Sequence, residues 1–259
     1  MVSSRQALVR VPDATAQFWV VKLLTTAVGE ALSDFLVKTL DPVPVVAATA
    51  VLFAAAFAIQ FTARRYVPWR YWLFVTLVAV FGTMVADAIH IVLGVPYLVS
   101  TIGFAVILAA VFTVWGRTER TLSVHTITTN RRELFYWSAV LATFALGTAF
   151  GDLTAVTFGL GYWGSAILFA VLFALPGVGF RWFRLPATAA FWASYVVTRP
   201  LGASLADWLG VDHARGGLGV GTLLVSAIGI VVIAGLVAMM SARGTVRAAG
   251  PIPEDGGAV

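Results

Sequence analysis

Eight apolar segments, each about 18–27 residues long, follow one another along this chain of 259 residues. A transmembrane helix needs about 20 consecutive, mostly apolar residues to cross the hydrocarbon core of a bilayer. The segments are nearly continuous runs of Leu, Val, Ala, Ile and Phe, whereas the strands of a membrane barrel alternate apolar and polar residues. We therefore expect an all-α membrane protein with eight transmembrane helices. The expected spans are 14–40, 44–61, 71–93, 97–115, 134–160, 163–180, 185–209 and 218–240.

The composition excludes the soluble classes of protein. The chain is 60% hydrophobic and 11% charged, whereas a soluble domain carries about 25% charged residues. Eight spans leave no room for a soluble catalytic domain, and the G-x-S-x-G, H-E-x-x-H and G-x-x-x-x-G-K-[ST] motifs are absent from the sequence. With no cysteine, the chain also lacks disulfides and thiolate metal ligands. We expect a protein that is not an enzyme, binds neither nucleic acid nor an organic cofactor, and has the lipid bilayer as its partner.

The positive charges indicate how the chain lies in the membrane. Thirteen of the seventeen Lys and Arg residues fall in the termini and in the loops after even-numbered spans, while the other loops hold only Lys38 and Arg215. By the positive-inside rule, both termini are then cytoplasmic, in a multi-pass protein of the bacterial inner membrane. The net charge of +5 is explained by these loops. The expected parts are a cytoplasmic N-terminal segment (1–13), a first half (14–115), a cytoplasmic loop (116–133) ending in a capping box from Asn130 to Glu133, a second half (134–240) and a disordered cytoplasmic tail (241–259).

The odd-numbered spans share one sequence pattern, [FY]-W-x9-G-x3-[SAG]-D, without a gap. The two halves of the chain correspond as well, because Asp34 and Asp152 are 118 residues apart and Asp87 and Asp207 are 120 apart. The pattern predicts a two-helix hairpin that has been duplicated twice. Since each hairpin crosses the membrane an even number of times, the copies run in the same direction. We expect them to form a pseudo-fourfold bundle of parallel repeats around a central path.

Four stretches of the sequence are distinctive enough to compare with known families: residues 22–30 (KLLTTAVGE), 128–132 (TTNRR), 145–152 (ALGTAFGD) and 198–204 (TRPLGAS). Together with the four repeats and their tryptophans, they resemble a family of bacterial membrane proteins built from a repeat of unknown function. The similarity extends from about Val11 to Met240. It implies the fold and orientation described above, and it implies no activity.

The repeated aspartates are the candidate ion or proton ligands. Each lies 15 residues after the tryptophan of its repeat, about 22 Å along a helix, which places all four at one level in the outer half of the bilayer. Ionisable residues inside a membrane are costly, and they usually face the interior of the bundle and serve a function. The candidate set consists of Asp34, Asp87, Asp152, Asp207 and, one turn below the first of these, Glu30.

Charge counting favours a function in ion or proton handling. Within the spans, five acidic residues face two basic ones, a formal excess of three negative charges. This excess has to be relieved by protonation, by bound cations or by a water-filled cavity. Carboxylates and hydroxyls are hard ligands, of the type that suits Mg²⁺, Mn²⁺ and Ca²⁺. We predict a transporter or ion-conducting protein for a small hard cation, protons or both, in which the four aspartates are the metal ligands and a divalent cation is the bound ion.

A second group of residues is expected to support the aspartates. Lys22 and Arg199 are expected to act as internal counter-charges, and Pro200 is expected to interrupt the seventh span. The second-layer partners of the acids are expected to be Thr26, Thr83, Thr148 and His90.

Two other functions remain open at this stage. The acidic residues could serve assembly alone, accepting hydrogen bonds inside a non-transporting sensor or scaffold. Alternatively, the aromatic-rich spans could accommodate a small organic cation or another solute.

Overall fold

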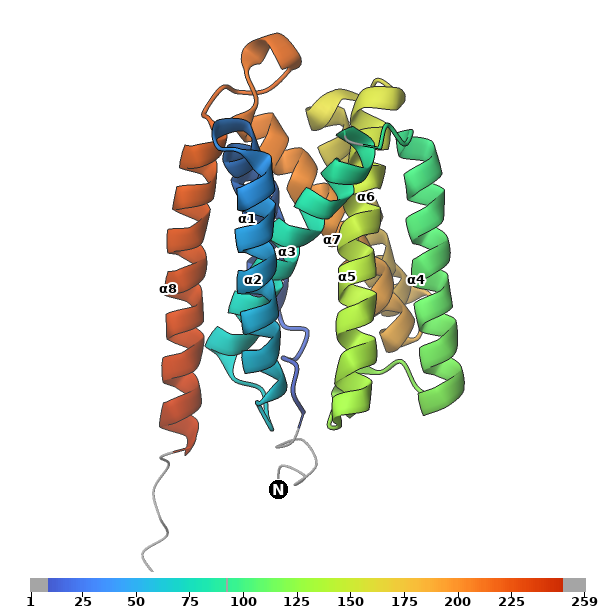
Figure 1. Ribbon diagram of the computed structural model, residues 1–259. Helices are drawn as coiled ribbons and strands as arrows, with labels where there is room; N and C mark the ends of the chain where they lie inside the picture. Colours follow the sequence, from blue (N-terminus) through green and yellow to red (C-terminus); the bar gives the residue numbers. More distant parts are fainter. Residues whose placement is uncertain (1–8, 92, 249–259) are drawn as a thin grey trace, which may run out of the picture.

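The computed structural model describes residues 9–91 and 93–248, which form eight α-helices and no strand (Figure 1). Three short helical turns, η2 (Val124–Thr126), η3 (Leu153–Thr157) and η4 (His213–Arg215), lie between them, and η3 has the wider π-helical winding. The α-helices are α1 (Ala16–Thr39), α2 (Pro42–Phe61), α3 (Pro68–Ile91), α4 (Tyr97–Glu119), α5 (Asn130–Asp152), α6 (Gly161–Trp182), α7 (Ala187–Gly210) and α8 (Thr222–Ala248).

The helices begin at residues that favour a helix start. The Thr15 hydroxyl accepts the backbone N–H of Phe18 at the start of α1, and the Asp41 carboxylate accepts that of Val43 at the start of α2. The expected capping box at the start of α5 is wrong by one residue. Thr129 is the cap there, because its hydroxyl accepts the N–H of Arg132.

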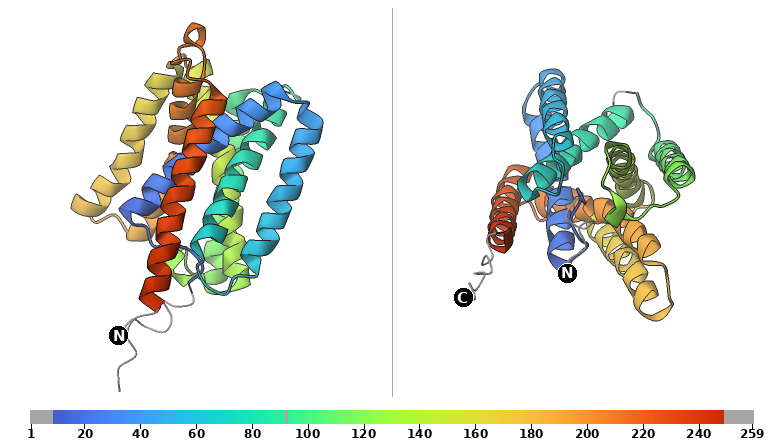
Figure 2. Two further views of the ribbon diagram at one scale, coloured as in Figure 1. Left: turned by 90° about the vertical axis from the view of Figure 1, so that its left-hand side faces the viewer. Right: turned by 90° about the horizontal axis from the view of Figure 1, so that it is seen from below.

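The four odd-numbered helices form a closed inner ring. α1 packs against α3 and α7, and α5 also packs against α3 and α7. The even-numbered helices lie outside this ring, and each packs mainly against the next odd-numbered helix: α2 on α3, α4 on α5, α6 on α7 and α8 on α1. Viewed along the bundle, α1, α3, α5 and α7 surround the centre (Figure 2). The odd-numbered helices therefore pack against one another around the centre of the bundle.

Both ends of the described chain lie at one end of the bundle, which we call the basal end; the opposite one is the distal end (Figure 1). Each odd-numbered helix runs from the basal to the distal end, and each even-numbered helix returns (Figure 1). Residues 9–11 pack against the basal end of the bundle. There Arg10 donates its backbone N–H to the Ile127 carbonyl, and Val11 is buried.

Six helices are long and apolar enough, by length and composition, to cross a membrane: α2, α3, α4, α5, α6 and α8. The outer four of these, α2, α4, α6 and α8, leave most of their apolar side chains exposed on the surface of the bundle, as a lipid-facing helix does. α1 and α7 fall outside this group. α1 carries Lys22 and Glu30 and α7 carries Arg199, and these charged residues lower the hydropathy of the two helices.

Two further expectations about helix bounds are wrong. α7 runs without interruption through Pro200, so the proline does not break the helix. α8 continues to Ala248, so residues 241–248 are helical; the rest of the expected disordered tail and residues 1–8 lie outside the described residues.

Candidate functional site

Each odd-numbered helix carries a row of residues spaced by four that ends in the repeated aspartate. Side chains at this spacing lie on one face of a helix, one turn above another. Nearly all positions below the aspartates are buried, while the aspartates themselves are only half-buried. The rows are 18-22-26-30-34 in α1, 71-75-79-83-87 in α3, 136-140-144-148-152 in α5 and 191-195-199-203-207 in α7.

The four aspartates line one cavity at the distal end of the ring, with a volume of about 470 Å³. Glu30 lies in its wall, one turn below Asp34. The cavity wall is therefore acidic on all four inner helices, as the repeat pattern predicts. The other lining residues are Val37, Lys38, Pro42, Val46, Met84, Ala88, Tyr97, Tyr162, Val211 and Arg215.

Two of the five acids in this cavity have a basic partner. Lys38, half-exposed at the distal surface, pairs with Asp34 one turn away on α1, and Arg199 pairs with Glu30. The other three have no ion-pair partner within the described residues: Asp87, Asp152 and Asp207. The cavity thus concentrates negative charge, and Lys38 and Arg215 are the basic residues in its lining.

Arg199 joins all four inner helices directly beneath the cavity. Its side chain, which projects from α7, is completely buried, and one guanidinium nitrogen is 2.6 Å from the Glu30 carboxylate of α1. The same nitrogen donates to the hydroxyls of Thr83 on α3 and of Thr148 on α5, the latter at 2.8 Å. A second nitrogen donates to the Thr26 carbonyl of α1 at 3.1 Å. The arginine therefore closes the bottom of the cavity with charge-assisted hydrogen bonds.

Glycines of the repeat allow the inner helices to approach this closely. A Cβ atom on Gly147 of α5 would lie 2.5 Å from Cγ of Arg199 and 2.8 Å from Cδ of Pro200. A Cβ atom on Gly202 of α7 would collide with the Thr26 side chain of α1. The small residues of the repeat are thus needed for helix contact, as in small-xxx-small packing.

Lys22 lies one turn below Thr26 and behaves differently from the expected counter-charge. Its ammonium group is completely buried and has no ion-pair or hydrogen-bond partner among the described residues. It lies 4.0 Å from the ring centroid of Phe144 and 4.4 Å from that of Tyr195. Lys22 was expected to act as an internal counter-charge, but among the described residues it pairs with no acid, and Arg199 pairs with the Glu30 carboxylate.

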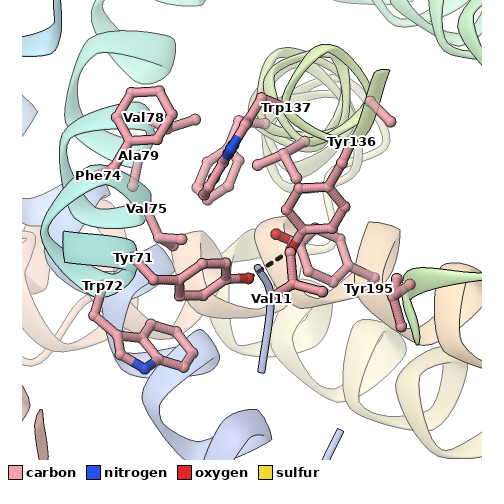
Figure 3. Packing of buried hydrophobic residues seen from close by; sticks show 14 of the residues in the cluster. Val11, Tyr71, Trp72, Phe74, Val75, Val78, Ala79, Tyr136, Trp137 and Tyr195 are labelled. Carbon is pink, nitrogen blue, oxygen red and sulfur yellow. Dashed lines mark hydrogen bonds between the residues drawn. The ribbon is translucent and has the colours of Figure 1, made fainter. Parts of the chain in front are cut away.

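An aromatic layer closes the inner ring below Lys22. The hydroxyls of Tyr71 on α3 and Tyr136 on α5 are 2.5 Å apart, with Val11 and Tyr195 beside them (Figure 3). Both tyrosines occupy the aromatic position of the repeat pattern and are completely buried. The path from the cavity to the basal end is therefore filled by side chains.

A second buried ionic cluster lies at the basal end and was not predicted from the sequence. Glu133 of α5 is completely buried, and its carboxylate is 2.7 Å from Arg10 and accepts a hydrogen bond of 2.8 Å from Gln60 of α2. The Trp137 indole N–H also donates to it, at 3.3 Å. The sequence pattern predicted Glu133 only as part of a capping box at the start of the helix, and a local pattern of this kind names no partner far along the chain.

Of the predicted second-layer residues, the three threonines lie at the inner ring and His90 lies elsewhere. Thr83 and Thr148 lie directly beneath the cavity as expected, and Thr26 joins α1 to α7 by donating its hydroxyl to the Thr198 carbonyl at 3.1 Å. His90 does not line the cavity. Its ring nitrogens face the Val95 carbonyl at 2.9 Å and the Ser100 hydroxyl at 3.3 Å, so it secures the turn between α3 and α4.

The irregular backbone near the aspartates follows the end of α5 and does not occur at Pro200. The π-helical turn η3 follows Asp152 directly, and single π turns in α-helices are frequent at functional sites. Within the described residues, no three acidic or histidine side chains lie close enough together to hold a metal ion. The aspartates therefore surround an open space and do not form a compact metal cage.

Comparison with known protein families agrees with the four hairpins. Four segments, residues 17–66, 70–121, 135–184 and 190–245, match the family model described as Repeat of Unknown Function (DUF347). The chain belongs to this repeat family. Each DUF347 match covers most of one odd-numbered helix and of the even-numbered helix that follows it, which confirms the predicted repeat unit. The chain matches no curated protein and no solved structure.

Proposed function

We propose that this DUF347 chain is a membrane carrier that binds a small cation in the acidic distal cavity and moves it across the bilayer. The observation that carries the proposal is the cavity of about 470 Å³ on the axis of the inner ring, with four repeated aspartates in its wall. Proteins avoid unpaired carboxylates at membrane depth unless those groups bind a proton, an ion or a substrate.

The size of the cavity supports a cation that keeps its water. One water molecule occupies about 30 Å³ in the liquid, so the cavity has room for an ion with a hydration shell. The absence of a compact cluster of ligands among the described residues agrees with this mode of binding. Mg²⁺ dehydrates reluctantly and is usually held through water by one or two carboxylates. Hard divalent cations of the Mg²⁺, Mn²⁺ and Ca²⁺ class, and protons, are thus the proposed cargo.

The closed basal side supports a carrier over an open channel. Below the cavity come the Arg199 network, the rings around Lys22 and the hydroxyl pair of Tyr71 and Tyr136. An ion in the cavity can pass only if these layers separate. In a carrier, such a structure corresponds to the state in which the site faces one side of the membrane.

The proposed topology has all eight helices crossing an inner membrane as parallel hairpins with pseudo-fourfold symmetry. α1 and α7 can carry charged residues because the other helices shield them from lipid. In the proposed orientation both termini are cytoplasmic and the cavity faces outward, and the arginines of the basal end support this orientation.

Thermal unfolding in detergent, with and without cations, tests the proposal. A ligand that binds only the folded state stabilises it by RT ln(1 + [L]/Kd), about 2.7 kcal/mol at a hundredfold excess over Kd. For a chain of this size, this corresponds to a Tm increase of about 5–10 °C. We expect such a saturable increase with Mg²⁺, Mn²⁺ or Ca²⁺ in the wild type and its loss in Asp152→Asn.

Asp41→Asn is the matched control, since it removes the same charge from the exposed cap of α2, outside the cavity lining. Asn caps a helix as well as Asp does, so this variant should keep both its stability and its response to the cation. A cation response that persists in Asp152→Asn would contradict binding at the aspartates. A wild type that responds to no cation, with an Asp152→Asn variant that simply melts earlier, would favour the sensor or scaffold.

A further inference from the structure

The carrier contains a buried amine that the acidic cavity does not use. Lys22 and Lys38 are the only lysines in the chain, and their surroundings differ. Lys38 is half-exposed and pairs with Asp34, whereas the Lys22 side chain is completely buried. No acceptor within the described residues lies in hydrogen-bond range of its Nζ atom.

An ammonium group in this position is poorly compensated. Burial of a charge without a partner costs several kcal/mol after relaxation of the protein. The two aromatic rings, with centroids at 4.0 and 4.4 Å, offset only part of this cost, because they offer the ammonium group no hydrogen-bond acceptor. A neutral amine fits the same space without that cost.

The neighbours of Lys22 make the positive charge still less favourable. α7 contributes Arg199, which remains charged at any accessible pH, and Tyr195, whose ring contacts Lys22. α5 and α3 contribute the hydroxyls of Tyr136 and Tyr71 at the next level toward the basal end, together with the apolar ring of Phe144. α2 and the described side chains of α8, which also pack on α1, contain no charged residue. The nearest acidic residue on α1 itself is Glu30, two turns away. Its carboxylate is already paired with Arg199.

We propose that Lys22 is a proton-binding site of the carrier, neutral in the conformation described here and protonated when the Arg199–Glu30 pair opens. The proton adds to the lone pair of Nζ, and no other covalent bond changes. When Glu30 separates from Arg199, an unpaired negative charge is left on the inward row of α1 two turns from Lys22, and this charge favours the new ammonium group over the neutral amine. Opening of the layer beneath the cavity is then linked to uptake of one proton. This inference rests on the proposed carrier function and adds proton coupling to it.

Nuclear magnetic resonance of protein labelled with ¹³C at lysine Cε tests the charge of Lys22 directly. The wild type should give two lysine signals, and Lys38→Arg identifies the one from Lys22. At about pH 8 an ordinary lysine, with a pKa near 10.4, is fully charged. We expect the Lys22 signal at the position of a neutral amine and the Lys38 signal at that of an ammonium group. A Lys22 signal at the ammonium position would overturn the inference.

The pH dependence of stability provides a second test. An amine that is neutral in the folded state and charged in the unfolded state leaves the unfolded state with one more proton, so stability rises with pH. The Tm of the wild type should therefore rise relative to that of Lys22→Met between about pH 6 and pH 9. A difference that stays constant over this range would contradict the proposal.

Failure of this inference can be told apart from failure of the carrier proposal. Both Lys22 tests need no cation, and the cation test depends on Asp152. If Lys22 proves charged while a cation still stabilises the wild type, the acidic cavity stands and only the proton site is lost.

Discussion

Removal of the Arg199 guanidinium should destabilise the folded protein more than any change to a surface charge. Arg199→Met keeps a long apolar side chain between the inner helices but leaves the buried Glu30 carboxylate without its cation. Thr83 and Thr148 lose the donor that they share, and the Thr26 carbonyl loses its guanidinium donor.

The structure sets the expected loss of stability in Arg199→Met. Removing one partner of a buried ion pair typically costs about 3–5 kcal/mol, because the other charge stays buried and unpaired. For a chain of this size, 1 kcal/mol shifts the Tm by about 2–4 °C, so a decrease of about 6–20 °C is expected. Lys38→Met is the matched control, since it removes a cation from the half-exposed pair with Asp34. Such exposed pairs contribute about 0–1 kcal/mol.

Thermal unfolding in detergent, followed through the nine tryptophans of the chain, measures both variants. The double variant Arg199→Met/Glu30→Gln removes both charges and should recover part of the lost stability, and the full double-mutant cycle isolates the coupling. Equal Tm values for Arg199→Met and Lys38→Met would refute the reasoning. A double variant that loses the sum of its two single losses would refute the pairing.

Two more predictions concern packing and topology. Gly147→Ala should lower stability by about 1–3 kcal/mol in the same unfolding assay, because its Cβ atom would overlap Arg199, whereas Gly103→Ala meets open space and should be neutral or slightly stabilising. Since the chain has no cysteine, single cysteines can map its orientation. A membrane-impermeant thiol reagent should label Ala214→Cys in intact cells and Arg65→Cys only after permeabilisation; the reverse pattern would invert the proposed topology.

The ring of inner helices was predictable because its information repeats along the chain. The tryptophan, glycine and aspartate positions recur at a fixed spacing in every odd-numbered span, so four equivalent helix faces could be aligned before any contact was known. A shared level of carboxylates follows from that alignment and from the rise of an α-helix. The cavity at Asp34, Asp87, Asp152 and Asp207 agrees with this expectation.

The partners of individual charges were not predictable, because they depend on contacts between residues far apart in sequence. Arg199 and Glu30 are 169 residues apart, and local spacing gives no reason to choose Arg199 over Lys22 as the partner. Glu133 looked like a helix cap because capping patterns are local, whereas its actual partner, Arg10, is 123 residues away.

Pro200 illustrates how packing overrides a local signal. A proline inside a helix removes one hydrogen bond, and on local grounds a break is expected. α7 nevertheless continues, because Thr26 donates to the Thr198 carbonyl and Arg199 binds three other helices, so contacts hold α7 next to the proline. His90 is the opposite case: its helical position near Asp87 suggested the cavity, but the turn before α4 supplies nearer partners.

Cation movement across liposomes that contain the purified protein tests the central claim most directly. Mg²⁺, Mn²⁺ and Ca²⁺ are followed with indicator dyes and protons with an internal pH dye, for the wild type and for Asp87→Asn/Asp152→Asn/Asp207→Asn. The account predicts that the wild type moves at least one of these ions faster than empty liposomes do, and that the folded triple variant does not. A wild type no faster than empty liposomes, or a triple variant as fast as the wild type, would contradict it.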